Sequence, residues 1–110
     1  IFEGHLPSTS RRLAQYLSRL RKERKTLVFY VDPKVLTGLL NLLAQILPTR
    51  QIAIAMNLTT NKETLSRGVP GELLEQIGPV PKDSAVTVVI EGYGAGSHNY
   101  SSSRRRMTTR

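Results

Sequence analysis

The stretch that decides the fold covers residues 26–33 and reads TLVFYVDP. Its first six residues are β-branched, aromatic or aliphatic, which is typical of a strand covered on both faces. Asp32 then offers a helix N-cap, and Pro33 suits the first position of a helix. The stretch therefore predicts a strand over 26–31 that passes directly into a helix, the connection expected of an α/β fold.

The helix that follows extends over 33–47 and ends before Pro48, which cannot continue it. Its apolar residues cover more than one face, so we expect this helix to be buried on more than one side. Either it lies at the centre of the fold or a partner protein covers it. The residues predicted to form such a partner interface are Val35, Leu39, Leu42 and Leu43.

Two further strands and two further helices complete the predicted domain. Residues 51–56 alternate with period two and residues 84–90 are rich in valine, so both are predicted strands. Residues 10–25 carry apolar side chains at helical spacing, and a shorter helix is predicted over 71–77. The element order is then α-β-α-β-α-β. Because strand–helix–strand units usually place their strands parallel, we expect a small, mostly parallel three-stranded sheet packed with helices.

Composition sets the expected boundaries. The 110 residues have room for one core. We assign 1–9 to an N-terminal extension, 10–92 to a compact α/β domain, and 93–110 to an extended basic tail rich in Gly, Ser and Arg.

No apolar run is long enough to cross a membrane, and no membrane partner is expected. The chain begins with Ile1, which fits an imported or processed protein. The compartment is left open, with the mitochondrion favoured over the cytoplasm.

Charge gives the strongest indication of a partner. Sixteen Lys and Arg against eight Asp and Glu give a net charge of +8, which points to a polyanion. Glu23 is the only acid between Ser8 and Val31, and cations at this density repel one another unless phosphates neutralise them. We therefore favour RNA binding over a face that merely serves solubility. The predicted contacts are Arg11, Arg12, Arg19, Arg21, Lys22, Arg24, Lys25, Arg104, Arg105, Arg106 and Arg110, with Tyr93 and Tyr100 as candidates for base stacking.

No set of residues for catalysis stands out. Cysteine is absent, which excludes a thiolate nucleophile and a cysteine-based metal site. His5 and His98 lie outside the predicted elements, while Glu72 and Glu75 share a solvated face. Asp32 follows a strand, where α/β sheets often bind ligands, but its role as a helix cap explains it. We therefore expect no enzyme, no metal, no cofactor and no small-molecule substrate.

The leading hypothesis is a non-catalytic, RNA-binding structural subunit of a large ribonucleoprotein. The simplest such complex is a ribosome, including the ribosome of an organelle. Its partners would be ribosomal RNA and neighbouring proteins of the complex. The alternative is a protein–protein interaction subunit that docks through the leucine-rich helix 33–47. The salt dependence of partner binding distinguishes the two hypotheses, because phosphate contacts weaken steeply as ionic strength rises and contacts between leucines hardly respond. The signatures of RNA-recognition motifs, KH domains and zinc fingers are absent.

Overall fold

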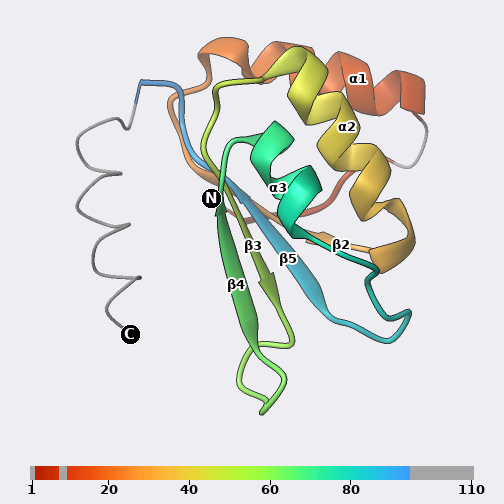
Figure 1. Ribbon diagram of the computed structural model, residues 1–110. Helices are drawn as coiled ribbons and strands as arrows, with labels where there is room; N and C mark the ends of the chain where they lie inside the picture. The colour runs from red at the N-terminus through yellow and green to blue at the C-terminus, as the bar shows by residue number, and fades with distance from the viewer. Residues whose placement is uncertain (1, 8–9, 95–110) are drawn as a thin grey trace.

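The computed structural model describes residues 2–7 and 10–94, which form a five-stranded sheet in the order β1-β2-β5-β3-β4 (Figure 1). Only β1 and β2 pair in parallel, and the other three pairings are antiparallel. The strands are β1 (Phe2–His5), β2 (Leu27–Val31), β3 (Ile52–Met56), β4 (Thr64–Gly68) and β5 (Val86–Ile90). The helices are α1 (Ser10–Arg19), α2 (Leu36–Ile46) and α3 (Pro70–Gln76), with 3₁₀ turns η1 (Leu20–Lys22) and η2 (Pro33–Val35).

This topology shows that the prediction of a mostly parallel three-stranded sheet in the order α-β-α-β-α-β was wrong. The described order is β-α-β-α-β-β-α-β, and β5 lies between β2 and β3, antiparallel to both. The cause is β4. After β3 the chain turns back through a hairpin, so one extra pass across the sheet reverses the direction in which it enters β5.

Both strands that the sequence did not reveal lie at the sheet edges. β1 falls in the segment assigned to an extension, and its pairing with β2 shifts register between Phe2 and Gly4, where Gly4 has a φ of +83°. β4 reads TLSRG and is mostly exposed along its first half, so no apolar alternation marks it. Edge strands of this kind are commonly polar, since one side of their backbone faces water.

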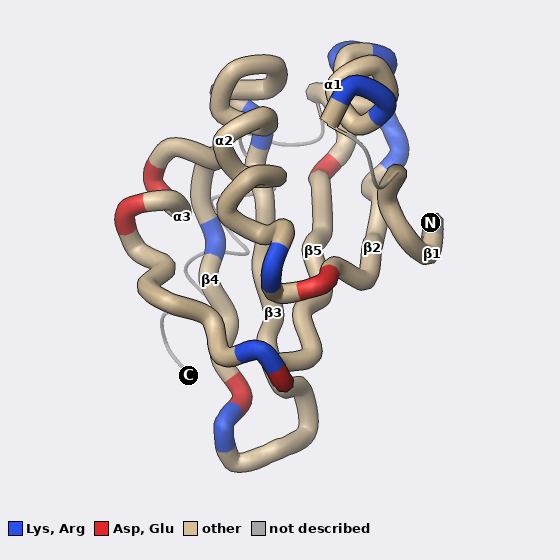
Figure 2. Tube along the Cα trace, turned by 90° about the vertical axis from the view of Figure 1, so that its right-hand side faces the viewer, with Lys and Arg blue, Asp and Glu red and all other residues tan. Residues whose placement is uncertain are grey.

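The core lies between the sheet and the helices, which all cover one face of the sheet (Figures 1 and 2). Phe29, Ile54 and Val88 point into it from the central strands, and they meet the buried leucines of α2. α2 also contacts α1 on one flank and α3 on the other. This position accounts for the wide apolar surface of α2. Within residues 2–7 and 10–94, no helix has the length and apolar character to cross a membrane.

Candidate functional site

A hollow of about 630 Å³ lies at the carboxyl ends of β1 and β2, beside the start of β5. A second hollow of about 310 Å³ adjoins it. The two share four lining residues: His5, Tyr30, Val31 and Asp32. Loops at the carboxyl ends of strands are the usual place for ligands in open α/β sheets. We call these two hollows together the strand-end site.

Two aromatic side chains form one wall of the strand-end site. The rings of His5 and Tyr30 lie 6.3 Å apart between centroids and are tilted by 59°. Tyr30 is 53% exposed although it belongs to β2, because it points away from the helices. Thr87 lies directly opposite Tyr30 on β5 and adds a hydroxyl to the lining. The wall therefore combines flat apolar surface with hydrogen-bonding groups.

Asp32 supplies the carboxylate of the strand-end site. Its Oδ1 accepts a hydrogen bond of 2.9 Å from the backbone N–H of Lys34 and caps η2, which confirms the predicted capping role. The side chain is exposed and also lines both hollows. Because a carboxylate has two acceptor oxygens, one cap bond leaves capacity for a ligand. Capping and binding are therefore compatible at this residue.

The far side of the site is fixed by Asn57, which follows β3. Its backbone N–H donates to the carbonyl of Ala85 at 2.9 Å, and its Oδ1 accepts from the backbone N–H of Ala85 at 3.1 Å. Asn57 has a φ of +54°, a conformation that Asn tolerates better than most residues. These two hydrogen bonds, one from the backbone and one to the side chain of Asn57, hold the lining residues Ala85 and Val86 in place.

The chemistry of the site suits a small polar molecule. Lys82 and Lys34 add positive charge near Asp32, and the volume falls within the range of about 300–1,000 Å³ common for small-molecule sites. No group of three or more metal-binding side chains occurs in the part of the chain that the structure describes. A charged organic ligand with a ring fits this lining better than a metal ion does.

The cations predicted on the first helix line one exposed surface. Leu17 and Leu20 are buried against the core, so the remaining faces of α1 and η1 point outward. The guanidinium of Arg19 lies 5.7 Å from the centre of the Tyr16 ring. Lys and Arg gather on and just after α1 in Figure 2, whereas elsewhere they occur as single, separate positions. We call this surface the basic face; it comprises Arg11, Arg12, Arg19, Arg21, Lys22, Arg24 and Lys25, all exposed.

The other predicted site residues are scattered. Tyr93 is 46% exposed and lies after β5, near the end of the basic face. Leu39 and Leu43 are core residues, Leu42 is half-buried, and Val35 is 51% exposed. The remaining predictions lie outside the described residues: Tyr100, Arg104, Arg105, Arg106 and Arg110.

Several lining residues escaped the sequence analysis. Tyr30 carried a signal, since it is a polar aromatic residue in an otherwise apolar strand. Lys82, Ser84 and Thr87 carried none, because only the antiparallel placement of β5 brings them beside β2. Sites assembled from distant segments depend on topology, and the topology itself was predicted wrongly.

Most of this chain is similar in sequence to proteins of known name. No protein-family model matches the chain. The chain is 30% identical over 92 residues to ribosomal RNA small subunit methyltransferase I of Thermotoga maritima, a match that covers 84% of this chain and 41% of that protein. It is 30% identical over 91 residues to the protein of the same name from Bacillus subtilis, covering 83% and 31%. The chain thus spans less than half the length of these relatives.

Solved structures agree on the fold. The methyltransferase CobJ superposes with a TM-score of 0.57 at 19% identity, over 88% of this chain and 42% of that one. The cobalamin biosynthetic enzyme cobalt precorrin-4 methyltransferase, CbiF, superposes with a TM-score of 0.54 at 10% identity, over 83% and 40%. At these identities the likeness establishes the fold alone, a mixed sheet with helices that occurs in methyltransferases.

These findings correct the predicted function. The relatives are enzymes by name, so the prediction of a non-catalytic ribosomal structural protein was wrong, and so was the prediction of no enzyme. The mitochondrial placement rested on that hypothesis and is withdrawn with it. The alternative of docking through helix 33–47 loses its basis, since the core accounts for the leucines. The relatives are named for ribosomal RNA, so RNA stays a hypothesis for this chain, whereas the predicted absence of a small-molecule substrate is not supported, because methyltransferases use a methyl donor.

Proposed function

We propose that this chain is a domain of an RNA methyltransferase and contributes to binding both the methyl donor and the RNA. The observation that carries the proposal is the 30% identity over 92 residues to a methyltransferase named for small-subunit ribosomal RNA. The match covers 84% of this chain. The fold that the chain shares with other methyltransferases supports the same conclusion.

The residues of the strand-end site fit a sulfonium donor such as S-adenosylmethionine. Such a donor carries a positive sulfur, a charged amino-acid end and a flat base. The Tyr30 ring suits a cation or a base, and the Asp32 carboxylate suits a positive group. When bound, a donor of this kind supplies a methyl group to a nucleophilic oxygen or nitrogen of RNA, which loses a proton as the sulfonium becomes a neutral thioether.

The basic face is the part of the chain suited to the RNA. Its cations lie on α1, η1 and the residues just after η1, and Glu23 is the one acid among them. Contacts of Arg and Lys with phosphates position an RNA without reading its sequence. In this proposal the basic face holds the RNA strand, while the strand-end site accepts the donor at the carboxyl ends of β1 and β2.

Donor binding tests the proposal directly. On titration with S-adenosylmethionine, the backbone NMR signals of Tyr30, Asp32 and Thr87 are expected to shift, and Tyr30→Ala is expected to weaken binding about 3- to 30-fold, as loss of a cation–ring contact does. Asp32→Asn keeps the helix cap and should weaken binding about two- to fivefold through the lost charge. Leu65→Ala removes an exposed apolar side chain on β4, outside the site, and serves as the matched control.

A transfer assay tests the same proposal at the level of chemistry. A donor with a labelled methyl group is mixed with small-subunit ribosomal RNA and the chain, and label is expected in the RNA fraction. The proposal fails if no label enters the RNA and the donor also leaves the signals of the strand-end site unchanged. Shifts confined to residues elsewhere in the chain would contradict the assigned site.

A further inference from the structure

Tyr93 is fixed in place although its ring is 46% exposed. It follows β5, at the opposite end of the sheet from the strand-end site. Its backbone N–H donates a hydrogen bond of 2.6 Å to the carbonyl of Glu23. One side of the ring meets the guanidinium of Arg50, whose central carbon lies 5.8 Å from the ring centre. A ring that is supported on one side and open to solvent is a surface for stacking.

Arg50 makes this support rigid. Its Nη2 donates to the carbonyls of Leu20 and Arg21, each at 3.0 Å, and its Nη1 donates to the carbonyl of Glu91 at 3.3 Å. Burial lowers the pKa of Arg50 below its ordinary value, and the nearby Tyr93 partly opposes this effect. The guanidinium is therefore committed to carbonyls at the end of η1, where a cation is favourable. Arg50 therefore positions Tyr93, and its guanidinium is not free to bind a phosphate.

Polar groups for a flat ligand lie beside the ring. A hollow of about 270 Å³ is lined by Thr49, Gln51 and Tyr93 among others. The Oε1 of Gln51 is buried and has no hydrogen-bond partner in the described part of the chain. An unpaired buried acceptor is costly, but this oxygen is covered by protein and is not a contact for a ligand. What the hollow adds to the stacking surface is a lining of the polar residues Thr49, Gln51 and Glu91.

The basic face extends to the surface formed by Glu23, Arg50 and Tyr93, which we call the stacking corner. Gly92 packs so closely against the backbone of Arg24 that a Cβ at Gly92 would lie 1.9 Å from the Arg24 carbonyl oxygen. The stacking ring and the cations after α1 are therefore connected through directly touching backbone. The exposed cations nearest in sequence to this contact are Arg21, Lys22, Arg24 and Lys25.

We propose that Tyr93, backed by Arg50, stacks on an unpaired nucleobase of single-stranded RNA while the cations next to it neutralise the flanking phosphates. The inference rests on the proposed RNA-methyltransferase function and adds to it a second RNA contact, at the far end of the domain from the strand-end site. A paired base has both faces covered by its neighbours, so this corner selects RNA with an unstacked base.

The test is the affinity of the chain for short RNA oligonucleotides in dilute salt, without methyl donor. Tyr93→Ala is expected to weaken binding of a single strand roughly 5- to 150-fold, the range found when a base-stacking aromatic residue is removed. Tyr93→Phe keeps the ring and should bind within about threefold of the unchanged chain. Leu65→Ala removes an exposed side chain on β4 and is the matched control.

Two ligands separate stacking from charge. An abasic strand of equal length keeps the phosphates, so Tyr93→Ala should leave its affinity unchanged, and the same holds for a duplex. In the unchanged chain, a strand with 2-aminopurine should lose fluorescence on binding, a readout that does not require a stable variant. The inference is overturned if Tyr93→Ala binds the single strand normally, if it weakens the abasic strand equally, or if 2-aminopurine fluorescence does not fall.

These outcomes are distinct from those of the proposed function. A chain that transfers no methyl group can still show the loss with Tyr93→Ala, since the binding assay contains no donor. Conversely, a chain that methylates RNA while Tyr93→Ala binds RNA normally overturns only the stacking corner.

Discussion

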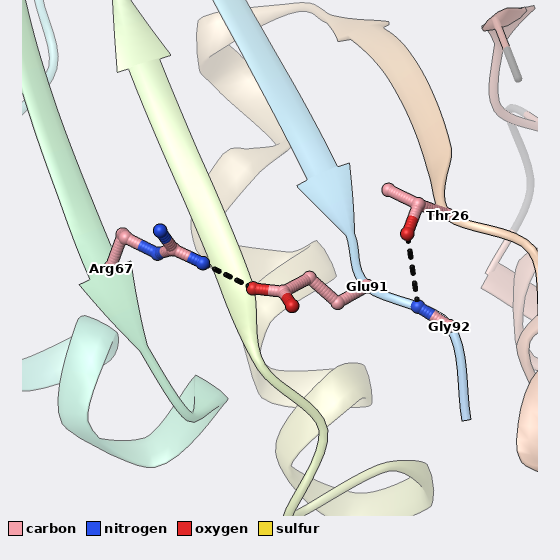
Figure 3. Close-up of polar contacts among 4 residues, drawn as sticks. All are labelled: Thr26, Arg67, Glu91 and Gly92. Carbon is pink, nitrogen blue, oxygen red and sulfur yellow. Dashed lines mark hydrogen bonds and ion pairs between the residues drawn. The ribbon is translucent and has the colours of Figure 1, made fainter. Parts of the chain in front are cut away.

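At the residue scale, a few backbone contacts hold together the end of the sheet that carries Tyr93. The Gly92 N–H donates to the Thr26 hydroxyl at 3.3 Å, and Gly92 is buried against the chain that leaves η1 (Figure 3). Gly92 is the last residue of the predicted compact domain and directly precedes the glycine-rich segment assigned to the extended tail, 93–110. Composition misleads at this position because glycine serves two purposes: it loosens a chain in solvent, and it also allows two backbones to touch.

Gly92→Ala is expected to lower the free energy of unfolding by about 2–4 kcal/mol, because backbone must move to admit the methyl group. The neighbour that blocks the Cβ is the Arg24 carbonyl, which cannot rotate away as a side chain would. Urea denaturation measures the effect. Gly38→Ala is the control: it lies exposed in α2 with nothing within 4 Å of its Cβ, and it should stabilise the chain by about 0.5–1 kcal/mol. Equal effects of the two substitutions would contradict the close contact.

At the element scale, the sequence located the central strands and missed the edges. The predicted strands at 26–31, 51–56 and 84–90 contain β2, β3 and β5, because buried strands need apolar residues at every inward position. The alternation in β5 indicates which side chains point inward, but it contains no information about direction. The direction of β5 depends on how the chain returns after β3. Because β3 and β4 form a hairpin, the chain enters β5 antiparallel to β3, and the polar edge strand β4 gave no sign of this hairpin in the sequence.

An ion pair between Arg67 and Glu91 ties β4 to the end of β5 across β3, on the face away from α2 (Figure 3). Both side chains are more than four-fifths buried. Glu91→Gln is expected to cost about 1–3 kcal/mol of stability, because it removes a charge from a partly buried pair. The amides of β4 should then exchange hydrogen faster relative to those of β2, as measured by NMR.

Glu75→Gln is the control for this prediction, since Glu75 is exposed on α3. It should leave both stability and exchange within about 0.5 kcal/mol of the unchanged chain. If Glu91→Gln speeds exchange in β2 as much as in β4, the ion pair stabilises the whole sheet and does not act as a local tie for the edge strand.

At the scale of the whole molecule, two surfaces lie at different parts of one sheet. The strand-end site draws on segments around His5, Tyr30 and Thr87, and the stacking corner joins Glu23, Arg50 and Tyr93. Neither set is close in sequence, so neither could be predicted without the topology. The exposure of the basic face could be predicted, because its residues lie in one continuous segment, α1, η1 and the residues just after η1, and the apolar spacing of α1 indicates which side points outward.

If RNA binds along the whole basic face, the affinity of the chain for RNA should depend on salt concentration. The logarithm of affinity for single-stranded RNA should fall linearly with the logarithm of salt concentration, by about 0.7 for each phosphate contact. Replacing Arg11 and Arg19 together by Gln should therefore reduce the slope by about 1.4. Lys62→Gln removes an exposed cation from the β3–β4 loop, away from α1, and should leave the slope unchanged. If Lys62→Gln reduces the slope as much per charge as the arginine substitutions do, RNA responds to net charge alone, and the basic face is not its binding surface.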